Sequence, residues 1–392
     1  MAAFAALLPR STTEAHRAAT PLELFVDLCF VVAVAQAAAS LHHAIAEDHV
    51  SQALIGFPMV FFAIWWAWLQ FTWFASGYDN DDAVYRIATF VQVAGILVLA
   101  AGVPTAFEGD FRVIVVGYVI VRLSLVFQYL RAAKSDPARA FALRGMSLAI
   151  GVLQVLWILF AVFVTGAWQL PCFLALVACE MAVPVWGQMK ASIPWHPHHI
   201  AERYSLLTII VLGESILASV IAVQSAADVS ESLWPLVLTA TGALVIVCSM
   251  WWLYFNAPTV GLLERSQDDA GGLTAAFAWG FGHYVIFIVA AAVGAGVAVL
   301  VDVQIDVAEV SLQTATLAVG VPVAIYVASM WALHRPTFVS SRLTAATALA
   351  VVAVIAASLL ALPILVIGVI LVVLIAVNAA IRRASESVPV RS

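Results

Sequence analysis

The sequence has 392 residues, of which 64% are hydrophobic and only 10% are charged. A soluble domain carries about 25% charged residues, so a soluble protein is excluded and the surplus apolar surface must face lipid. The net charge of -6 comes from few ionisable residues, and no basic run typical of nucleic-acid binding occurs. We therefore expect an integral membrane protein whose partner is the lipid bilayer and which binds no nucleic acid.

Residues 1–20 are expected to form a cytoplasmic N-terminal segment. Arg10 and Arg17 follow its short apolar patch, which is the reverse of the order in a cleaved signal peptide. The first membrane-spanning helix is therefore expected to direct insertion.

Apolar runs of about 20 residues then recur along the chain, separated by polar breaks. These runs are too long and too continuously apolar for barrel strands, so an all-α protein is predicted. The twelve expected helices are 22–45, 52–75, 83–105, 111–131, 142–165, 168–188, 200–223, 233–255, 273–300, 312–333, 343–361 and 362–381.

Lysine and arginine residues concentrate in alternate loops. Arg86, Arg131 and Lys190 lie on the same side as the N-terminus, whereas Arg112 stands alone on the opposite side. Because loops rich in lysine and arginine remain inside the cell, both termini are predicted to be cytoplasmic.

The second half of the chain resembles the first. ELFVDLCFVVAVAQ from Glu23 is similar to ERYSLLTIIVLGES from Glu202, and WWAWLQF from Trp65 is similar to WWLYFNA from Trp251. Two weaker matches follow in the same order, which favours an internal duplication over chance similarity of apolar helices. We predict a six-helix repeat over 21–195, a second over 196–382 and a cytoplasmic tail over 383–392. Since six is even, the two repeats would enter the membrane in the same orientation, as a parallel repeat.

A few ionisable residues fall at membrane depth, where a lone charge costs about 2.5–3.5 kcal/mol on insertion scales. They are Glu23, Asp27, Arg122, Glu180, Glu202, Glu214 and His283. Each needs a partner, water or a neutral state.

Partners for these groups follow from their depth. Asp27 lies one turn beyond Glu23 on the same helix face, and Arg203 can neutralise it if helices 22–45 and 200–223 pack together. Arg122 is placed to pair with Glu180 or with Glu214. Two interpretations stay open. Either these groups form ion pairs that fix the packing of the helices, or some of them line a path for a proton, an ion or a small solute. The residues proposed for such a path are Asp27, Glu214, Arg122, Glu180 and His283.

The stretch HPHH from His196 invites a metal site, but Pro197 divides it and no cysteine or further acid is close. Phosphate-binding loops, nucleophile elbows and zinc-protease motifs are also missing from the sequence. We expect no metal, no cofactor and no enzymatic activity.

Two motifs resemble the signatures of the bacterial low temperature requirement protein A family. PLELFVDLCFVVAVAQ is similar to E-L-F-x-D-L-x-F-V, and HHIAERYSLLTIIVLGESIL is similar to H-x-x-E-R-F/Y-x-L-x-x-I-I-x-L-G-E. The motif residues that the resemblance marks here are Glu23, Asp27, His199, Glu202, Arg203 and Glu214.

The resemblance implies a multi-pass protein of the cell inner membrane that is linked to growth at low temperature or under stress. It implies no particular molecular activity. Our working hypothesis is proton- or ion-linked transport through a polar seam between the repeats. The alternatives are a non-transporting scaffold or sensor, and an intramembrane enzyme that modifies lipids; a homo-oligomer is compatible with all three.

Overall fold

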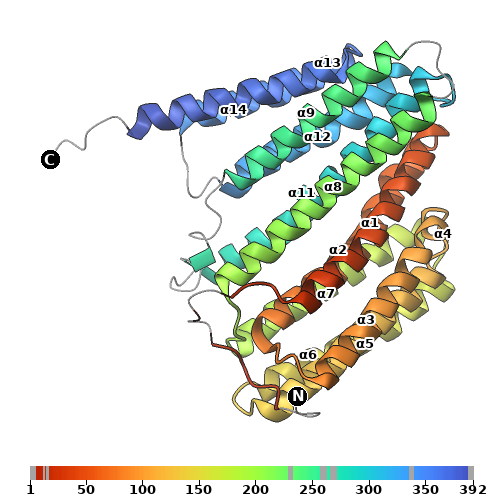
Figure 1. Cartoon of the computed structure of the whole chain (residues 1–392). Helices are drawn as coiled ribbons and strands as arrows, with labels where there is room; N and C mark the ends of the chain where they lie inside the picture. Colours follow the sequence, from red (N-terminus) through yellow and green to blue (C-terminus); the bar gives the residue numbers. More distant parts are fainter. Residues whose placement is uncertain are drawn as a thin grey trace. The chain divides into compact units, whose positions relative to one another are not determined.

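The structure is a computed structural model, and it describes residues 6–11, 14, 17–227, 233–256, 263–264, 272–334 and 340–386. Every regular element in these ranges is helical (Figure 1). Twelve of the helices are long and apolar enough to cross a membrane, as the sequence predicted. Arg265, Arg335 and Arg391, which also belong to the predicted basic loops, lie outside the described residues.

The first eight elements contain six of the long helices. They are α1 (Pro21–Ala46), α2 (Val50–Tyr78), α3 (Ala83–Ala101), α4 (Val103–Phe107), α5 (Arg112–Ser135), α6 (Ala140–Phe163), the 3-10 turn η1 (Gly166–Trp168) and α7 (Gln169–Lys190).

The elements whose bounds the described residues give after α7 are six long helices. They are α8 (Pro197–Ala227), α9 (Trp234–Phe255), α11 (Gly272–Gln304), α12 (Leu312–His334), α13 (Ser341–Leu359) and α14 (Ile364–Glu386).

The third predicted helix, 83–105, extends too far. In the structure α3 ends at Ala101, and the short helix α4 follows from Val103. Gly102 lies so close to the backbone of Ile114 that an added Cβ would collide with it, and Pro104 supplies no amide hydrogen to continue the α3 ladder. The chain therefore turns at Gly102, which a simple count of apolar residues does not reveal.

The helices form two compact units. Unit 1 contains Met1–Ser40 and Ser51–Leu207, and unit 2 contains Leu41–Val50 and Thr208–Ser392. The helices α1 and α8 each contribute residues to both units. The predicted repeats and their parallel arrangement stay predictions.

Each unit is organised around one deeply buried helix, α2 in unit 1 and α11 in unit 2. In unit 1, α3 packs on α5, α5 on α6 and α6 on α7. In unit 2, α12 packs on α11 and α13, and α14 packs on α9 and α13. The tryptophan-rich stretch of α2 supplies the core of unit 1, and polar groups inside that core need partners from neighbouring helices.

Candidate functional site

A reciprocal cap fixes the start of α1. The Thr20 amide donates to Glu23 Oε2 at 2.8 Å, and the Glu23 amide donates to Thr20 Oγ1 at 3.2 Å. This arrangement is a capping box, which satisfies two amides that the helix itself leaves without acceptors. It holds the fully buried Glu23 carboxylate at the positive end of α1.

The second oxygen of Glu23 faces two basic side chains. His199 Nε2 lies 2.9 Å from Glu23 Oε1, and Arg17 Nη2 lies 4.0 Å from the same oxygen. Both basic side chains are buried. Glu23 is therefore more than a cap, because it also joins α1 to α8 and to the N-terminal segment within unit 1.

Asp27 lies one turn further along α1. Arg203 Nη2 donates to its Oδ1 at 2.5 Å, and Trp68 Nε1 donates to the same oxygen at 2.9 Å. The expected pairing of Asp27 with Arg203 is thus confirmed. Asp27 Oδ2 and two nitrogens of Arg203 are buried without a hydrogen-bond partner among the described residues.

Arg17 reaches the same region from the N-terminal segment. Its guanidinium donates to the carbonyl oxygens of Ala75, at 2.7 Å, and of Ser76. These carbonyls belong to the last turn of α2, where the helix offers no internal donors. Arg17 Nη2 also lies 3.9 Å from Asp79 Oδ2. One guanidinium therefore caps the C-terminus of α2 and lies close to the carboxylates of Glu23 and Asp79.

Asp79 follows α2 directly and is only 4% exposed. Its Oδ1 accepts a hydrogen bond from the Asp81 amide at 2.9 Å, within a tight turn where Asp81 has a φ of 49°. Burial, reinforced by the negative charge of Glu23, raises the pKa of Asp79 to about 6, although Arg17 and Arg10 oppose this. A carboxyl group with this pKa is present in both charge states just below neutral pH.

We refer to six buried side chains of unit 1 together as the charge cluster. Its members are Arg17, Glu23, Asp27, Asp79, His199 and Arg203. Three carboxylates face two guanidiniums, so the cluster has a formal charge of −1 with a neutral imidazole. Arg10, which also approaches Asp79, is partly exposed and is paired with Glu14, so these two residues add no net charge. One added proton makes it neutral, which favours proton binding in a region of low dielectric.

Glu202 and His196 have a different role, since they hold the N-terminal segment. Glu202 Oε2 accepts a hydrogen bond from the Ala19 amide at 3.3 Å. The His196 imidazole bonds to the Glu14 carbonyl through Nε2 at 2.8 Å, and the His196 amide donates to Ser76 Oγ. Within the described ranges, no group of three or more potential ligand residues is arranged to hold a metal ion.

A further buried carboxylate, Glu180 on α7, lies elsewhere in unit 1. Arg122 Nη2 donates to Glu180 Oε2 at 2.7 Å, which confirms one of the two expected pairings of Arg122. The other donors to Glu180 are Trp66 at 3.1 Å, Tyr118 at 3.0 Å, Trp157 at 3.2 Å and Gln154 at 3.5 Å. We call these six residues the Glu180 cluster; it shares no ion pair with the charge cluster.

Glu214 and His283 belong to unit 2. His283 is buried, with Nδ1 bonded to the Trp279 carbonyl at 2.8 Å and Nε2 bonded to the Tyr254 hydroxyl at 3.1 Å. This is the pattern of a neutral imidazole that donates once and accepts once. Glu214 is 9% exposed, and no basic side chain among the described residues of unit 2 lies close enough to form an ion pair with it.

Sequence reasoning missed Arg17, Asp79 and the indole donors Trp66, Trp68 and Trp157. The T-x-x-E spacing of Thr20 and Glu23 was the available signal for the cap and for the exact position of Glu23. The tryptophans gave no such signal, because an aromatic run in an apolar helix is equally compatible with plain core packing.

A family model described as bacterial low temperature requirement A protein (LtrA) matches residues 18–380. The chain belongs to the LtrA family. The match covers every member of the charge cluster except Arg17, and it covers the whole Glu180 cluster. Together with the twelve candidate spans, it identifies a multi-pass membrane protein.

A curated relative of this LtrA protein is described as "Uncharacterized protein RA0937" of Rhizobium meliloti (strain 1021). It is 27% identical over 305 residues, which cover 73% of this chain and 71% of the relative. No solved structure matches the chain. The charge cluster is therefore interpreted from its own chemistry.

Proposed function

We propose that this LtrA protein carries out proton-linked transport across the cell inner membrane, and that this activity supports growth at low temperature. The observation that carries the proposal is the charge cluster, whose formal charge of −1 is removed by a single proton. A buried excess charge is costly, so proton uptake is favoured there.

We assign the exchanged proton to Asp79. Asp27 is fixed by Arg203 and Trp68, and Glu23 is fixed by its cap and by His199. The cations nearest to Asp79 lie further from its carboxylate than Arg203 lies from Asp27 or His199 from Glu23. Arg17 is at 3.9 Å and Arg10 at 3.8 Å. Its pKa of about 6 allows both charge states near neutral pH.

Glu214 is the second proposed proton station. A carboxyl group at membrane depth without an ion-pair partner is stable in its neutral form. Release of its proton would require water or a cation, which is the behaviour expected of a transport site. Arg122, Glu180 and His283 are assigned to packing. Glu180 accepts hydrogen bonds from five side chains, among them the Arg122 guanidinium, and both ring nitrogens of His283 are bonded within unit 2.

Flux measurements on the purified full chain in liposomes test this proposal. The liposomes are loaded with a cytosolic metabolite extract, so that a coupled solute is present, and an imposed pH gradient is followed with an entrapped dye. We expect D79N and E214Q to lower the proton flux at least about tenfold. D81N is the matched control, because Asp81 is half-exposed and paired with Arg86, and it should retain the native flux.

Native flux in D79N would contradict the assignment of Asp79, and flux no greater than that of empty liposomes would contradict transport. A deletion strain separates the alternatives in the cell. If D79N and E214Q restore growth in the cold as well as the native gene does, a non-transporting scaffold or sensor is favoured.

A further inference from the structure

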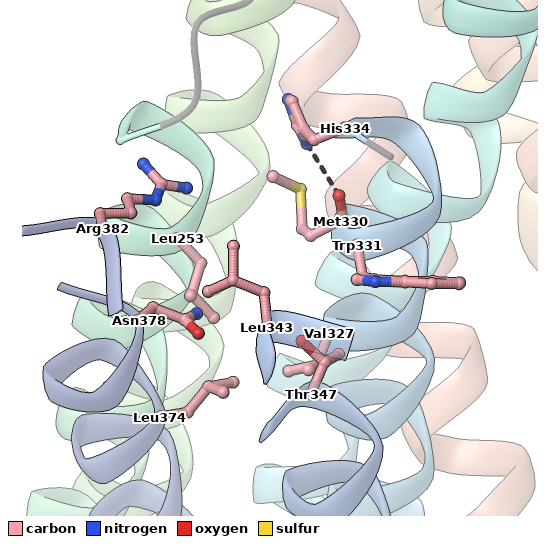
Figure 2. A pocket seen from close by; sticks show the side chains of 10 residues that line it. All are labelled: Leu253, Val327, Met330, Trp331, His334, Leu343, Thr347, Leu374, Asn378 and Arg382. Atoms are coloured by element: carbon pink, nitrogen blue, oxygen red, sulfur yellow. Dashed lines mark hydrogen bonds between the residues drawn. The ribbon is translucent and has the colours of Figure 1, made fainter. Parts of the chain in front are cut away.

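A cavity of about 80 Å³ lies in unit 2, apart from any residue discussed so far. It is bordered by the C-terminal turns of α9, α12 and α14 and by the first half of α13. Figure 2 shows Arg382 and His334 on opposite sides of one end of the cavity, with Leu374 toward the other end.

Along α14 and α12 the lining residues run from apolar to basic. Helix α14 contributes Leu374, Asn378 and Arg382, which are spaced by four residues and therefore share one helix face. Helix α12 contributes Val327 and His334, which are seven residues apart. Here too the apolar residue comes first and the basic residue lies toward the C-terminal end of the helix. Eight residues of α-helix span about 12 Å. Over this distance the lining passes from the hydrocarbon of Leu374 to the carboxamide of Asn378 and the guanidinium of Arg382, and it matches the length of a phospholipid from the start of its acyl chains to its phosphate.

The polar end of the cavity fits an anion. Arg382 Nη1 donates to the Asn256 carbonyl at 3.1 Å, which orients the guanidinium. None of the described residues that line the cavity is acidic. A guanidinium offers a planar fork of donors that matches phosphate oxygens.

The side chain of Asn378 favours a ligand that carries a hydrogen-bond donor. Its Oδ1 is buried and has no hydrogen-bond partner among the described residues. A buried acceptor without a partner is unfavourable, and a ligand hydroxyl would satisfy it. Thr347, which is 9% exposed, supplies a further hydroxyl on the α13 side.

The volume limits the ligand to a small group. A cavity needs about 10–15 Å³ to hold one water molecule. A cavity of about 80 Å³ therefore accommodates a phosphate with an attached small alcohol but no peptide helix. We propose that the cavity binds the headgroup of an anionic glycerophospholipid, with the phosphate on Arg382 and a headgroup hydroxyl on Asn378. The apolar end then receives the start of the acyl chains, which a free phosphate lacks.

Native mass spectrometry of the purified full chain in detergent tests this site. The probes are phosphatidylglycerol, phosphatidylcholine with the same acyl chains, and glycerol phosphate. We expect R382Q to weaken phosphatidylglycerol binding at least about tenfold and R382K to weaken it less. R383Q is the matched control, since Arg383 is the exposed neighbouring residue and does not line the cavity; it should bind as the native protein does.

A second variant keeps the test informative if R382Q does not fold. With phosphatidic acid as a fourth probe, the native protein should prefer phosphatidylglycerol, because the headgroup of phosphatidic acid has no alcohol hydroxyl, and N378L should remove that preference. Three results would overturn the proposal: equal binding of phosphatidylglycerol and phosphatidylcholine, equal effects of R382Q and R383Q, or glycerol phosphate binding as tightly as the lipid. The last result would identify a soluble phosphate as the ligand.

Discussion

Glu180 and Asp79 are both buried carboxylates of unit 1, but their surroundings favour different protonation states. Glu180 accepts hydrogen bonds from five side chains, one of them the guanidinium of Arg122. Asp79 accepts one from a backbone amide, and its cations lie near 4 Å. The first environment fixes an ionised carboxylate in place, whereas the second allows its charge to change.

Replacement of Asp79 should alter how stability depends on pH. The pKa of Asp79 in the folded protein, about 6, is above the ordinary 3.8. Its protonated form therefore stabilises the fold below pH 3.8, and this contribution, about 3 kcal/mol, is lost as pH rises through 6. Compared with the native protein, D79N should gain relative stability between pH 5 and pH 8 in thermal unfolding in detergent. A stability difference that is constant over this range would contradict the shifted pKa.

Glu180 should behave as a packing residue. E180Q leaves the Arg122 guanidinium buried without a countercharge, so the free energy of unfolding should fall by about 3–5 kcal/mol. The double variant R122Q/E180Q removes both charges and should recover part of that loss. Unfolding is measured in detergent, with D110N as the control because Asp110 and Arg112 form an exposed pair. Native stability together with reduced flux in E180Q would instead place Glu180 on a transport path.

The two ion pairs could be predicted because charges at membrane depth need partners and few candidates exist. Arg203 and Arg122 lay at suitable depths, and both pairings are present. Asp79 could not be predicted, since it is one of several polar residues after α2. Its burial depends on Arg17 and the N-terminal segment, whose path is determined by long-range contacts such as the hydrogen bond from the Leu7 amide to Ser135.

At the scale of elements, the twelve long helices could be predicted because a lipid environment leaves the backbone no other solution for long apolar runs. Helix ends were less predictable. The end of α3 depends on contact with α5, where Gly102 approaches Ile114. Such a contact is a property of two helices together and leaves only a weak signal in either one.

The α3–α5 contact makes a specific prediction about Gly117. A Cβ at this position would collide with the Leu99 amide and lie 2.6 Å from the Gly95 carbonyl oxygen. G117A should therefore destabilise the protein by about 1–3 kcal/mol through overpacking. G151A on α6 is the control, because nothing lies within 4 Å of its added Cβ, and helix propensity predicts a gain of up to about 1 kcal/mol. Equal melting temperatures for the two variants would show that α3 and α5 are not in close contact.

At the scale of the whole molecule, the distribution of basic residues predicts where the termini lie. Arg86, Arg131 and Lys190 lie near the ends of α3, α5 and α7 that the topology predicts on the side of the N-terminus, whereas Arg112 begins α5 on the predicted opposite side. We propose that both termini are cytoplasmic. A fluorescent protein fused to the C-terminus, of a kind that matures only in the cytoplasm, should be bright. Activity from a periplasmic phosphatase fused at the same point would contradict this orientation.

The function of the molecule could be predicted only as a class. Hydropathy and two motifs were sufficient for a multi-pass LtrA protein, because both are local properties of the sequence. The charge balance of the buried cluster was not local. It required Arg17, Asp79 and His199 to come from three separate parts of the chain.

Protonation of Asp79 is the central claim, and infrared difference spectroscopy measures it directly. Spectra of the purified full chain are compared between pH 8 and pH 5, for the native protein, D79N and the control D81N. We predict that the native protein and D81N gain the absorbance of a protonated buried carboxyl group at pH 5 and that D79N does not. The same gain in D79N as in the native protein would contradict the proposal that the charge cluster takes up its proton on Asp79.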